Sequence, residues 1–141
     1  MTKLIIITNN KNQVEKVKQF LKEENIKYFE NNYIVIKNTL AEKIKISDIN
    51  YVDTQDRRLC YHLTDKTEKY SKTLQDDFLN EVHPLEENPY MIFIRHGVLV
   101  NLANIKSVDK RTSLVKFNNG EELRIAKSYL DEVYNTFYNL V

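Results

Sequence analysis

The stretch that decides the fold reads Pro89-Tyr-Met-Ile-Phe-Ile-Arg-His-Gly-Val-Leu-Val-Asn-Leu-Ala-Asn-Ile105. Two apolar runs, residues 91–94 and 98–100, have the length and composition of β-strands. Between them stands the cationic step Arg95-His96-Gly97, which holds one of the two glycines of the chain. A strand that only had to be buried would not carry these three residue types, so we expect the step to be a turn at a sheet end.

Two asparagines, Asn101 and Asn104, frame the apolar pair that follows the second strand. In a tight turn an asparagine side chain bonds to backbone groups. We therefore interpret both residues as structural.

Short β-like runs extend outward from this stretch in both directions. They cover residues 43–46, 50–53, 59–63 and 68–71 before it and 105–110, 112–117 and 122–125 after it. Asn118-Asn119-Gly120 predicts a hairpin between the last two, because an Asn-Gly pair tolerates positive φ. The polar residues 54–57 predict a loop before Leu59.

A short helix is expected over residues 74–82, with Ser71 or Thr73 as its N-cap. Its expected inward residues are Leu74, Phe78 and Leu79. Asp76, Asp77 and Glu81 then form its solvated face, and residues 83–90, with two prolines, form a loop.

A final helix is expected from residue 129 to about residue 140, capped by Ser128. Its expected inward residues are Leu130, Val133, Phe137 and Leu140.

The first forty residues follow another pattern, which predicts a strand over residues 3–8, a helix over 11–24 and a strand over 33–37. The apolar face of that helix consists of Val14, Val17, Phe20 and Leu21. We expect residues 1–40 to form a small α/β strand–helix–strand module. A phosphoacceptor receiver is longer and has acidic residues after its first strand, so we exclude one here. Docking, dimerisation and plain packing stay open as roles of the module.

Length and composition fit one domain, or one domain with an appendage, in a chain of 141 residues that is 42% hydrophobic. We find no apolar run long enough to cross a bilayer and no signal peptide, so no membrane insertion is expected. The single cysteine, Cys60, excludes an internal disulfide. Together these features favour the cytoplasm.

The formal net charge of +1 argues by itself against nucleic acid, but the charges are unevenly distributed. Residues 1–43 carry eight lysines and five acids, whereas residues 44–141 carry thirteen Lys plus Arg and fifteen acids. The acids of the second part are clustered, which leaves room for a local positive face.

Catalytic and metal-binding patterns are not evident in the sequence. The chain has one Cys and three His, without zinc-site spacing, and no glycine-rich phosphate loop. Cys60 and His62 lie two apart in one strand, which by itself is no nucleophile–base pair. We interpret His62 as a structural or surface residue and His83 as solvated. We predict no enzyme, no metal and no cofactor.

From about residue 43 to the C-terminus the chain resembles the LytTR family, the DNA-binding domains of LytR/AlgR-type bacterial transcription regulators. Four stretches carry the resemblance in order: residues 48–53, 74–79, 91–105 and 115–127. The third is similar to the family pattern F-x-R-I-H-R-S-Y-L-V-N-L-x-x-I. The fourth is similar to V-x-L-x-N-G-x-x-L-x-V-S-R.

The resemblance implies a mainly β fold over residues 43–141, antiparallel with a short helix, joined to the small N-terminal unit and ending in the C-terminal helix. It also implies that loops, rather than a recognition helix, enter successive major grooves of DNA. Three family base-contact positions match Arg57 or Arg58, His96 and Lys127.

The chain departs from the family at the positions that matter most. Arg95 stands where the family has His, and an arginine still donates to a phosphate. Gly97 and Ala126 each replace a serine and so remove a hydroxyl donor. Lys127 replaces arginine and loses the fork that reads guanine.

We predict a DNA-binding surface at the loops and strand ends, because a groove reader must project side chains beyond its sheet. Its candidate residues are Arg57, Arg58, Arg95, His96, Gly97, Lys110, Arg111, Lys127 and Ser128. Ordinary solvated loop charges are the alternative interpretation of the same residues.

The function predicted is that of a sequence-specific, stand-alone LytTR transcription regulator without a receiver. Its expected partner is double-stranded DNA with direct repeats, bound by two copies or a homodimer, and the N-terminal module could bind a regulatory protein. The alternative is a LytTR-like protein-interaction module with weakened DNA binding. The acidic balance of residues 44–141 and the departures from the family pattern motivate that alternative.

Overall fold

The computed structural model describes residues 11–25 and 33–140. These residues fall into two compact units, with α1 (Lys11–Glu23) in the first and residues 33–140 in the second. The predicted strand over residues 3–8 lies outside the described residues. A separate module over residues 1–40 therefore stays a prediction.

The predicted helix of the first unit is confirmed as α1. Val14, Val17 and Leu21 are half-buried on one side of it. Phe20, which we expected on the same face, is 56% exposed. No helix among the described residues is long and apolar enough to cross a membrane.

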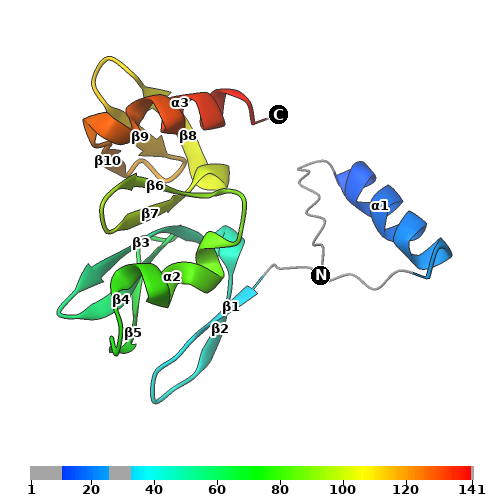
Figure 1. The fold of residues 1–141 in the computed structure, drawn as a ribbon, viewed down its shortest axis with the longest axis horizontal. Coiled ribbons are helices and arrows are strands. Elements are labelled where there is room, and N and C mark those ends of the chain that lie inside the picture. Colours follow the sequence, from blue (N-terminus) through cyan, green and yellow to red (C-terminus); the bar gives the residue numbers. More distant parts are fainter. Residues whose placement is uncertain (1–10, 26–32, 141) are drawn as a thin grey trace. The chain divides into compact units, whose positions relative to one another are not determined.

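The second unit is built from antiparallel strands (Figure 1). A two-stranded sheet pairs β1 (Tyr33–Ile36) with β2 (Glu42–Lys45). A five-stranded sheet has the order β5 (Glu68–Thr73), β4 (Arg58–Leu63), β3 (Ile49–Gln55), β7 (Val98–Asn101), β6 (Met91–Arg95). A three-stranded sheet has the order β10 (Glu122–Arg124), β9 (Leu114–Phe117), β8 (Ile105–Asp109). The predicted mainly β fold with a C-terminal helix is confirmed.

Helical segments connect and cover these sheets. They are α2 (Phe78–Glu86), α3 (Leu130–Tyr138) and the short 3-10 turns η1 (Ile46–Asp48), η2 (Leu102–Asn104) and η3 (Lys127–Tyr129).

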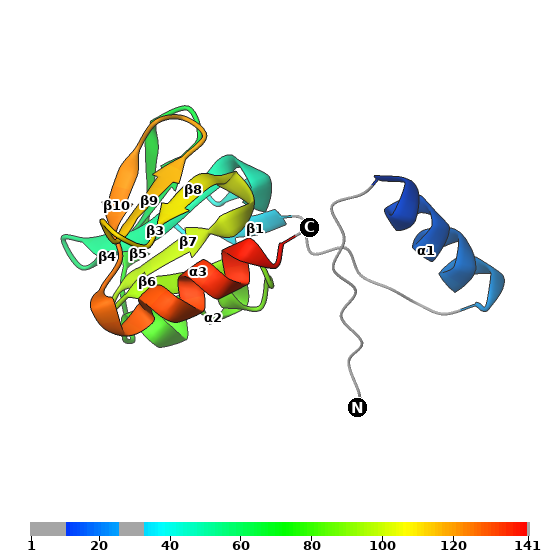
Figure 2. The same ribbon diagram turned by 90° about the horizontal axis from the view of Figure 1, so that it is seen from above.

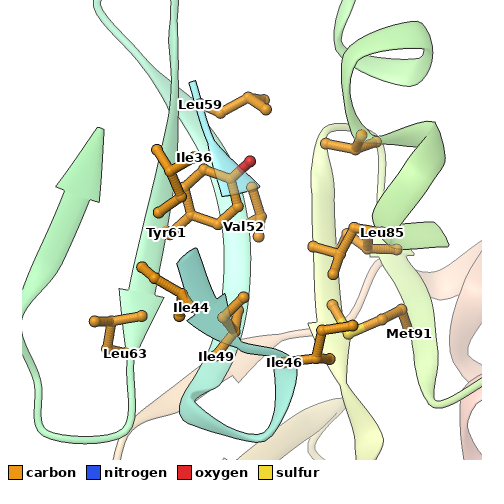
Figure 3. Close-up of a cluster of buried hydrophobic side chains, with 12 residues drawn as sticks. Ile36, Ile44, Ile46, Ile49, Val52, Leu59, Tyr61, Leu63, Leu85 and Met91 are labelled. Atoms are coloured by element: carbon orange, nitrogen blue, oxygen red, sulfur yellow. The ribbon is translucent and has the colours of Figure 1, made fainter. Parts of the chain in front are cut away.

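Two apolar clusters lie on opposite faces of the five-stranded sheet, because successive side chains of a strand point to opposite sides. Val52, Tyr61 and Leu99 belong to one cluster, together with residues of β1, β2 and α2 (Figure 3). Val98 and Val100 belong to the other, with residues of the three-stranded sheet and α3. The sheet that carries the opening stretch is thus the middle layer of the second unit.

The strand predicted over residues 33–37 is confirmed as β1, and it is part of the second unit. It pairs with β2, and Ile36 is buried in the first core cluster. The backbone N–H of Lys72 donates to the carbonyl of Lys37 at 2.8 Å, which joins this hairpin to the end of β5.

The short helix begins later than predicted. Ser71 and Thr73 are not caps but belong to β5, where Ser71 Oγ accepts from the N–H of Leu59 at 3.0 Å. Asp77 is the N-cap of α2 and accepts from the N–H of Asn80 at 3.0 Å.

The rest of α2 also differs from the prediction. The helix continues through Pro84. Because proline has no N–H, the helix lacks one backbone hydrogen-bond donor near its C-terminal end. Its buried residues are Val82 and Leu85, whereas Leu79, predicted to face inward, is 49% exposed.

The C-terminal helix is confirmed with a different start. Residues 127–129 form η3, and Tyr129 rather than Ser128 occupies the N-cap position of α3. The predicted inward face is confirmed: Val133 is buried and Leu130, Phe137 and Leu140 pack against the second cluster.

The two asparagines of the opening stretch act as predicted, through the backbone. Asn101 Nδ2 donates to the carbonyls of Ile46 and Ile49 at 3.2 and 3.1 Å. Asn104 Nδ2 donates to the carbonyls of Ser47 and Ile49, both at 2.9 Å. These bonds tie the end of β7 to the beginning of β3.

Candidate nucleic-acid interface

The step Arg95-His96-Gly97 forms the turn of the β6–β7 hairpin. Arg95 is paired with Val98, and His96 and Gly97 make the connection. Gly97 has φ of 77°, a left-handed conformation that glycine adopts at little cost. This geometry leaves His96 exposed at the tip, while Arg95 is half-buried at its base.

The side chain of Arg95 reaches a neighbouring segment. Its Nη1 donates to the carbonyl of Arg124 at 3.3 Å, across from β6 to the end of β10. A second bond runs in parallel, from the N–H of Ala126 to the carbonyl of Ile94 at 2.8 Å. The β6–β7 turn and the segment before η3 are thus held side by side.

The β3–β4 turn presents the first pair of candidate arginines. Asp56 and Arg57 both have positive φ, 52° and 59°, as a tight two-residue hairpin turn requires. Thr54 and Gln55, predicted as loop, instead continue β3 to its pairing with Arg58. Arg57 and Arg58 are both exposed.

The β3–β4 and β6–β7 turns lie at the same end of the five-stranded sheet. β3 and β7 are antiparallel, with Tyr51 opposite Val100 and Val52 opposite Leu99. Continuing that register brings the end of β3 alongside the β6–β7 turn and slightly beyond it. Figure 1 shows both hairpin tips on the left side of the second unit, with the start of α3 above them. In the perpendicular view of Figure 2 the start of α3 again lies at that side.

The β8–β9 turn joins the same region through the backbone. The N–H of Ile125 donates to the carbonyl of Ser113 at 2.7 Å. Within the turn, Asp109 accepts from the N–H of Thr112 and of Arg111, at 3.3 and 2.9 Å. These bonds lower the pKa of the Asp109 carboxyl, so it stays ionised and keeps the turn closed. Arg111 is exposed on this turn.

We call the β3–β4, β6–β7 and β8–β9 turns, together with residues 124–128, the loop edge. All nine predicted site residues lie on it: Arg57, Arg58, Arg95, His96, Gly97, Lys110, Arg111, Lys127 and Ser128. Their placement on one edge is an observation, and their contact with DNA stays a prediction.

Lys110 differs from the other cations of the loop edge. Its Nζ lies 3.2 Å from Asp131 and 5.0 Å from the ring centroid of Tyr134, both on α3. Half of this side chain is exposed, so the pair is partly screened by solvent. We infer that Lys110 holds the β8–β9 turn against α3 and offers less charge to a ligand than its neighbour Arg111.

One cation of the loop edge was missed from the sequence. Arg124 is exposed at the end of β10, and its carbonyl accepts the bond from Arg95. The sequence pattern that could have indicated an exposed Arg124 is the alternation along residues 122–124, in which Leu123 points inward and its two neighbours point outward.

The remaining cations of the loop edge form no ion pair within the second unit. Among residues 33–140, no acid lies within ion-pair distance of Arg57, Arg58, Arg95, Arg111, Arg124 or Lys127. Several guanidinium groups, together with His96, thus stand at the ends of separate hairpins. Such groups suit phosphate oxygens and guanine edges.

A family model described as the LytTr DNA-binding domain matches residues 38–137 of the chain. The chain belongs to the LytTR family. Among solved structures, the LytTr DNA-binding domain of a putative methyl-accepting/DNA response regulator from Bacillus cereus is similar to it. That comparison has a TM-score of 0.57 and 18% identity, and it covers 77% of this chain and 98% of the other. No curated protein matches the chain.

The family match and the structural likeness together confirm the LytTR resemblance and its fold. The match begins at residue 38, between β1 and β2, so it takes in all of the loop edge. The residues that the resemblance predicts at the family's base-contact positions, Arg57 or Arg58, His96 and Lys127, lie in three different parts of this edge.

Proposed function

We propose that this LytTR protein is a bacterial transcription regulator that recognises specific double-stranded DNA sequences through its loop edge. The observation that carries the proposal is the gathering of cations from separate hairpins at one end of the five-stranded sheet, most of them exposed and without an ion-pair partner among the described residues. A row of turns can follow the curved surface of DNA and enter its grooves in succession.

The cations of the loop edge have different proposed roles, which depend on where each one lies on its turn. Arg95 is half-buried and braced by the carbonyl of Arg124, so its guanidinium serves best as a fixed phosphate contact. His96 and Arg57 occupy the tips of two hairpins, where side chains reach farthest beyond the sheet. We assign base recognition to these two residues.

Lys127 takes the third position, at the beginning of η3. An ammonium group binds phosphate as a point charge but does not form the planar fork that reads guanine. We therefore assign Lys127 to the DNA backbone, with Ser128 beside it as a hydroxyl donor. Binding by two copies to direct repeats would then compensate for the small number of base contacts in each copy.

The proposal is tested by titrating the protein against its own upstream DNA and against scrambled DNA at several salt concentrations. Specific binding that weakens with salt supports it. Arg95→Ala should weaken binding to both DNAs and reduce the salt slope by about 0.9. His96→Ala should instead reduce the preference for the upstream DNA.

A matched control is Lys45→Ala. Lys45 is an exposed lysine at the end of β2, next to η1 and at the opposite end of β3 from the loop edge. This variant should bind DNA as the wild type does. Folded wild-type protein that does not distinguish the two DNAs would contradict the proposal and favour the protein-interaction alternative.

A further inference from the structure

A polar cluster lies on one face of the five-stranded sheet, near the loop edge but not part of it. The register pairs Asp53 with Cys60 and Tyr51 with His62 across β3 and β4. On the other side of β4 it pairs His62 with Glu68. Since alternate residues of a strand share a face, Asp53, Cys60 and His62 project to the same side.

The donor atoms of this cluster converge. One oxygen of Asp53, the sulfur of Cys60 and a ring nitrogen of His62 all lie within 4.8 Å of one another. The His62 Nε2 to Asp53 Oδ1 distance is 2.8 Å. A tetrahedral zinc ion separates neighbouring ligands by about 3.3 Å, so modest side-chain shifts would admit it.

The imidazole of His62 is held in place for this role. Its ring stacks on Tyr51 with centroids 3.9 Å apart and planes at 10°. Tyr51 in turn stacks on Phe117 of β9 at 5.6 Å. On the other side of the ring, His62 Nδ1 lies 3.5 Å from Glu68 Oε1. A histidine that binds metal through one nitrogen usually donates its other N–H to a carboxylate, and the Glu68 carboxylate lies on that side of the ring.

Burial of the cluster is graded from inside to outside. Cys60 is fully buried and His62 is 7% exposed, whereas the side chains of Asp53 and Glu68 are 25% and 41% exposed. Burial raises the pKa of the Cys60 thiol to about 11, so without a metal the sulfur is a neutral thiol. Solvent therefore reaches the cluster at the Asp53 side.

From this geometry we infer that Asp53, Cys60 and His62 form a binding site for a divalent transition metal, with zinc as the best fit, and that Glu68 orients His62. Thiolate and imidazole ligands favour zinc over magnesium or calcium. Three protein ligands leave a fourth coordination position for water. The site would clamp β3 to β4 a few residues before the turn that carries Arg57.

The test uses the full chain, freed of metal by a chelator that is then removed, and measured without DNA. Zinc is titrated in competition with a chromophoric chelator, and stoichiometry is read by native mass spectrometry. Cobalt is the spectroscopic probe, because a thiolate ligand gives a near-ultraviolet charge-transfer band. The proposal expects one ion per chain, the thiolate band, and a higher melting temperature with zinc.

Variants assign the ligands. Cys60→Ser should abolish the charge-transfer band and the stabilisation by zinc, and Glu68→Gln should weaken binding by about tenfold. Because Cys60 is buried, folding is checked by circular dichroism, and Asp53→Asn at the more exposed ligand gives a second, milder test. It should weaken zinc binding while it keeps an acceptor for His62.

His83→Ala is the matched control. His83 is 68% exposed on α2 and has Glu86 and Glu87 at 4.0 and 3.7 Å, so among the described residues it is the other place where a histidine and carboxylates meet. This variant should retain the site. Absence of stoichiometric binding, or binding that survives Cys60→Ser and is lost in His83→Ala, would overturn the inference. Neither result bears on DNA binding.

Discussion

Asn101 Nδ2 donates to the backbone carbonyl of Ile49 at 3.1 Å, which links two strands whose residues are 52 positions apart in the chain. The same amide donates to Ile46, and its oxygen accepts from the N–H of Ala103 at 3.1 Å. Asn101 is 2% exposed, so water cannot replace these bonds. One side chain thereby fixes the base of the β7 strand that supports the loop edge.

We predict that Asn101→Ala lowers the free energy of unfolding by about 2–3 kcal/mol, because the carbonyls of Ile46 and Ile49 each lose one of their donors and the N–H of Ala103 loses its acceptor. Urea unfolding measures this. The matched control is Asn139→Ala, which removes an exposed amide bond to the carbonyl of Asn135. A loss for Asn101→Ala no larger than that of the control would contradict the assigned role.

Gly97→Ala should cost about 1 kcal/mol through the backbone conformation, since φ is 77°. A Cβ at this position would meet none of the described residues within 4 Å, so no clash adds to the cost. Gly97→Asn should cost less, because asparagine tolerates the left-handed region better. Thermal unfolding of both variants checks this, and equal losses would show that the left-handed conformation is not the cause.

The N-cap assignments give a paired prediction. Asp77→Ala should lower the free energy of unfolding by about 1 kcal/mol, because its carboxylate accepts from the N–H of Asn80. Ser128→Ala should change it by less than about 0.5 kcal/mol, because Tyr129 is the N-cap residue of α3. Chemical denaturation compares the two. The reverse order of losses would restore the capping role that the sequence suggested for Ser128.

Two adjacent cations on the β8–β9 turn should behave differently toward DNA. Arg111→Ala should reduce the salt slope of binding by about 0.9, whereas Lys110→Ala should change it less, because Lys110 is already paired with Asp131. Fluorescence titration at several salt concentrations measures both slopes. Equal slopes would mean that the pair with Asp131 opens on DNA.

The strands of this fold were predictable because their signals are local. The alternation in β2, the apolar runs on either side of Gly97 and the Asn-Gly pair before β10 each appear within a few residues. The hairpin at Gly120 was predicted from this pair. Of the described residues 118–120 in that turn, Gly120 alone has positive φ.

The errors arose where a distant partner decides the outcome. Ser71 looked like a cap, but its hydroxyl accepts from Leu59, 12 residues away. Likewise, the sequence did not indicate the carboxylate partner of Lys110, Asp131, which is 21 residues away on α3.

The candidate metal site shows the same limit of sequence reasoning. The shared face of Cys60 and His62 was visible from their spacing, but the contribution of Asp53 depends on the register between β3 and β4. The pairing register depends on the packing of the whole sheet. The local sequence pattern therefore predicted the two strands but not that Asp53, Cys60 and His62 lie together.

The most direct test of DNA recognition by the loop edge is selection of binding sites from a randomised double-stranded DNA library, with the wild type and His96→Ala side by side. We predict that the wild type enriches a defined sequence that occurs as a direct repeat, and that the variant loses or changes the enriched bases at one position in each half. Failure of the folded wild type to enrich any sequence, or an identical motif from both proteins, would contradict this account.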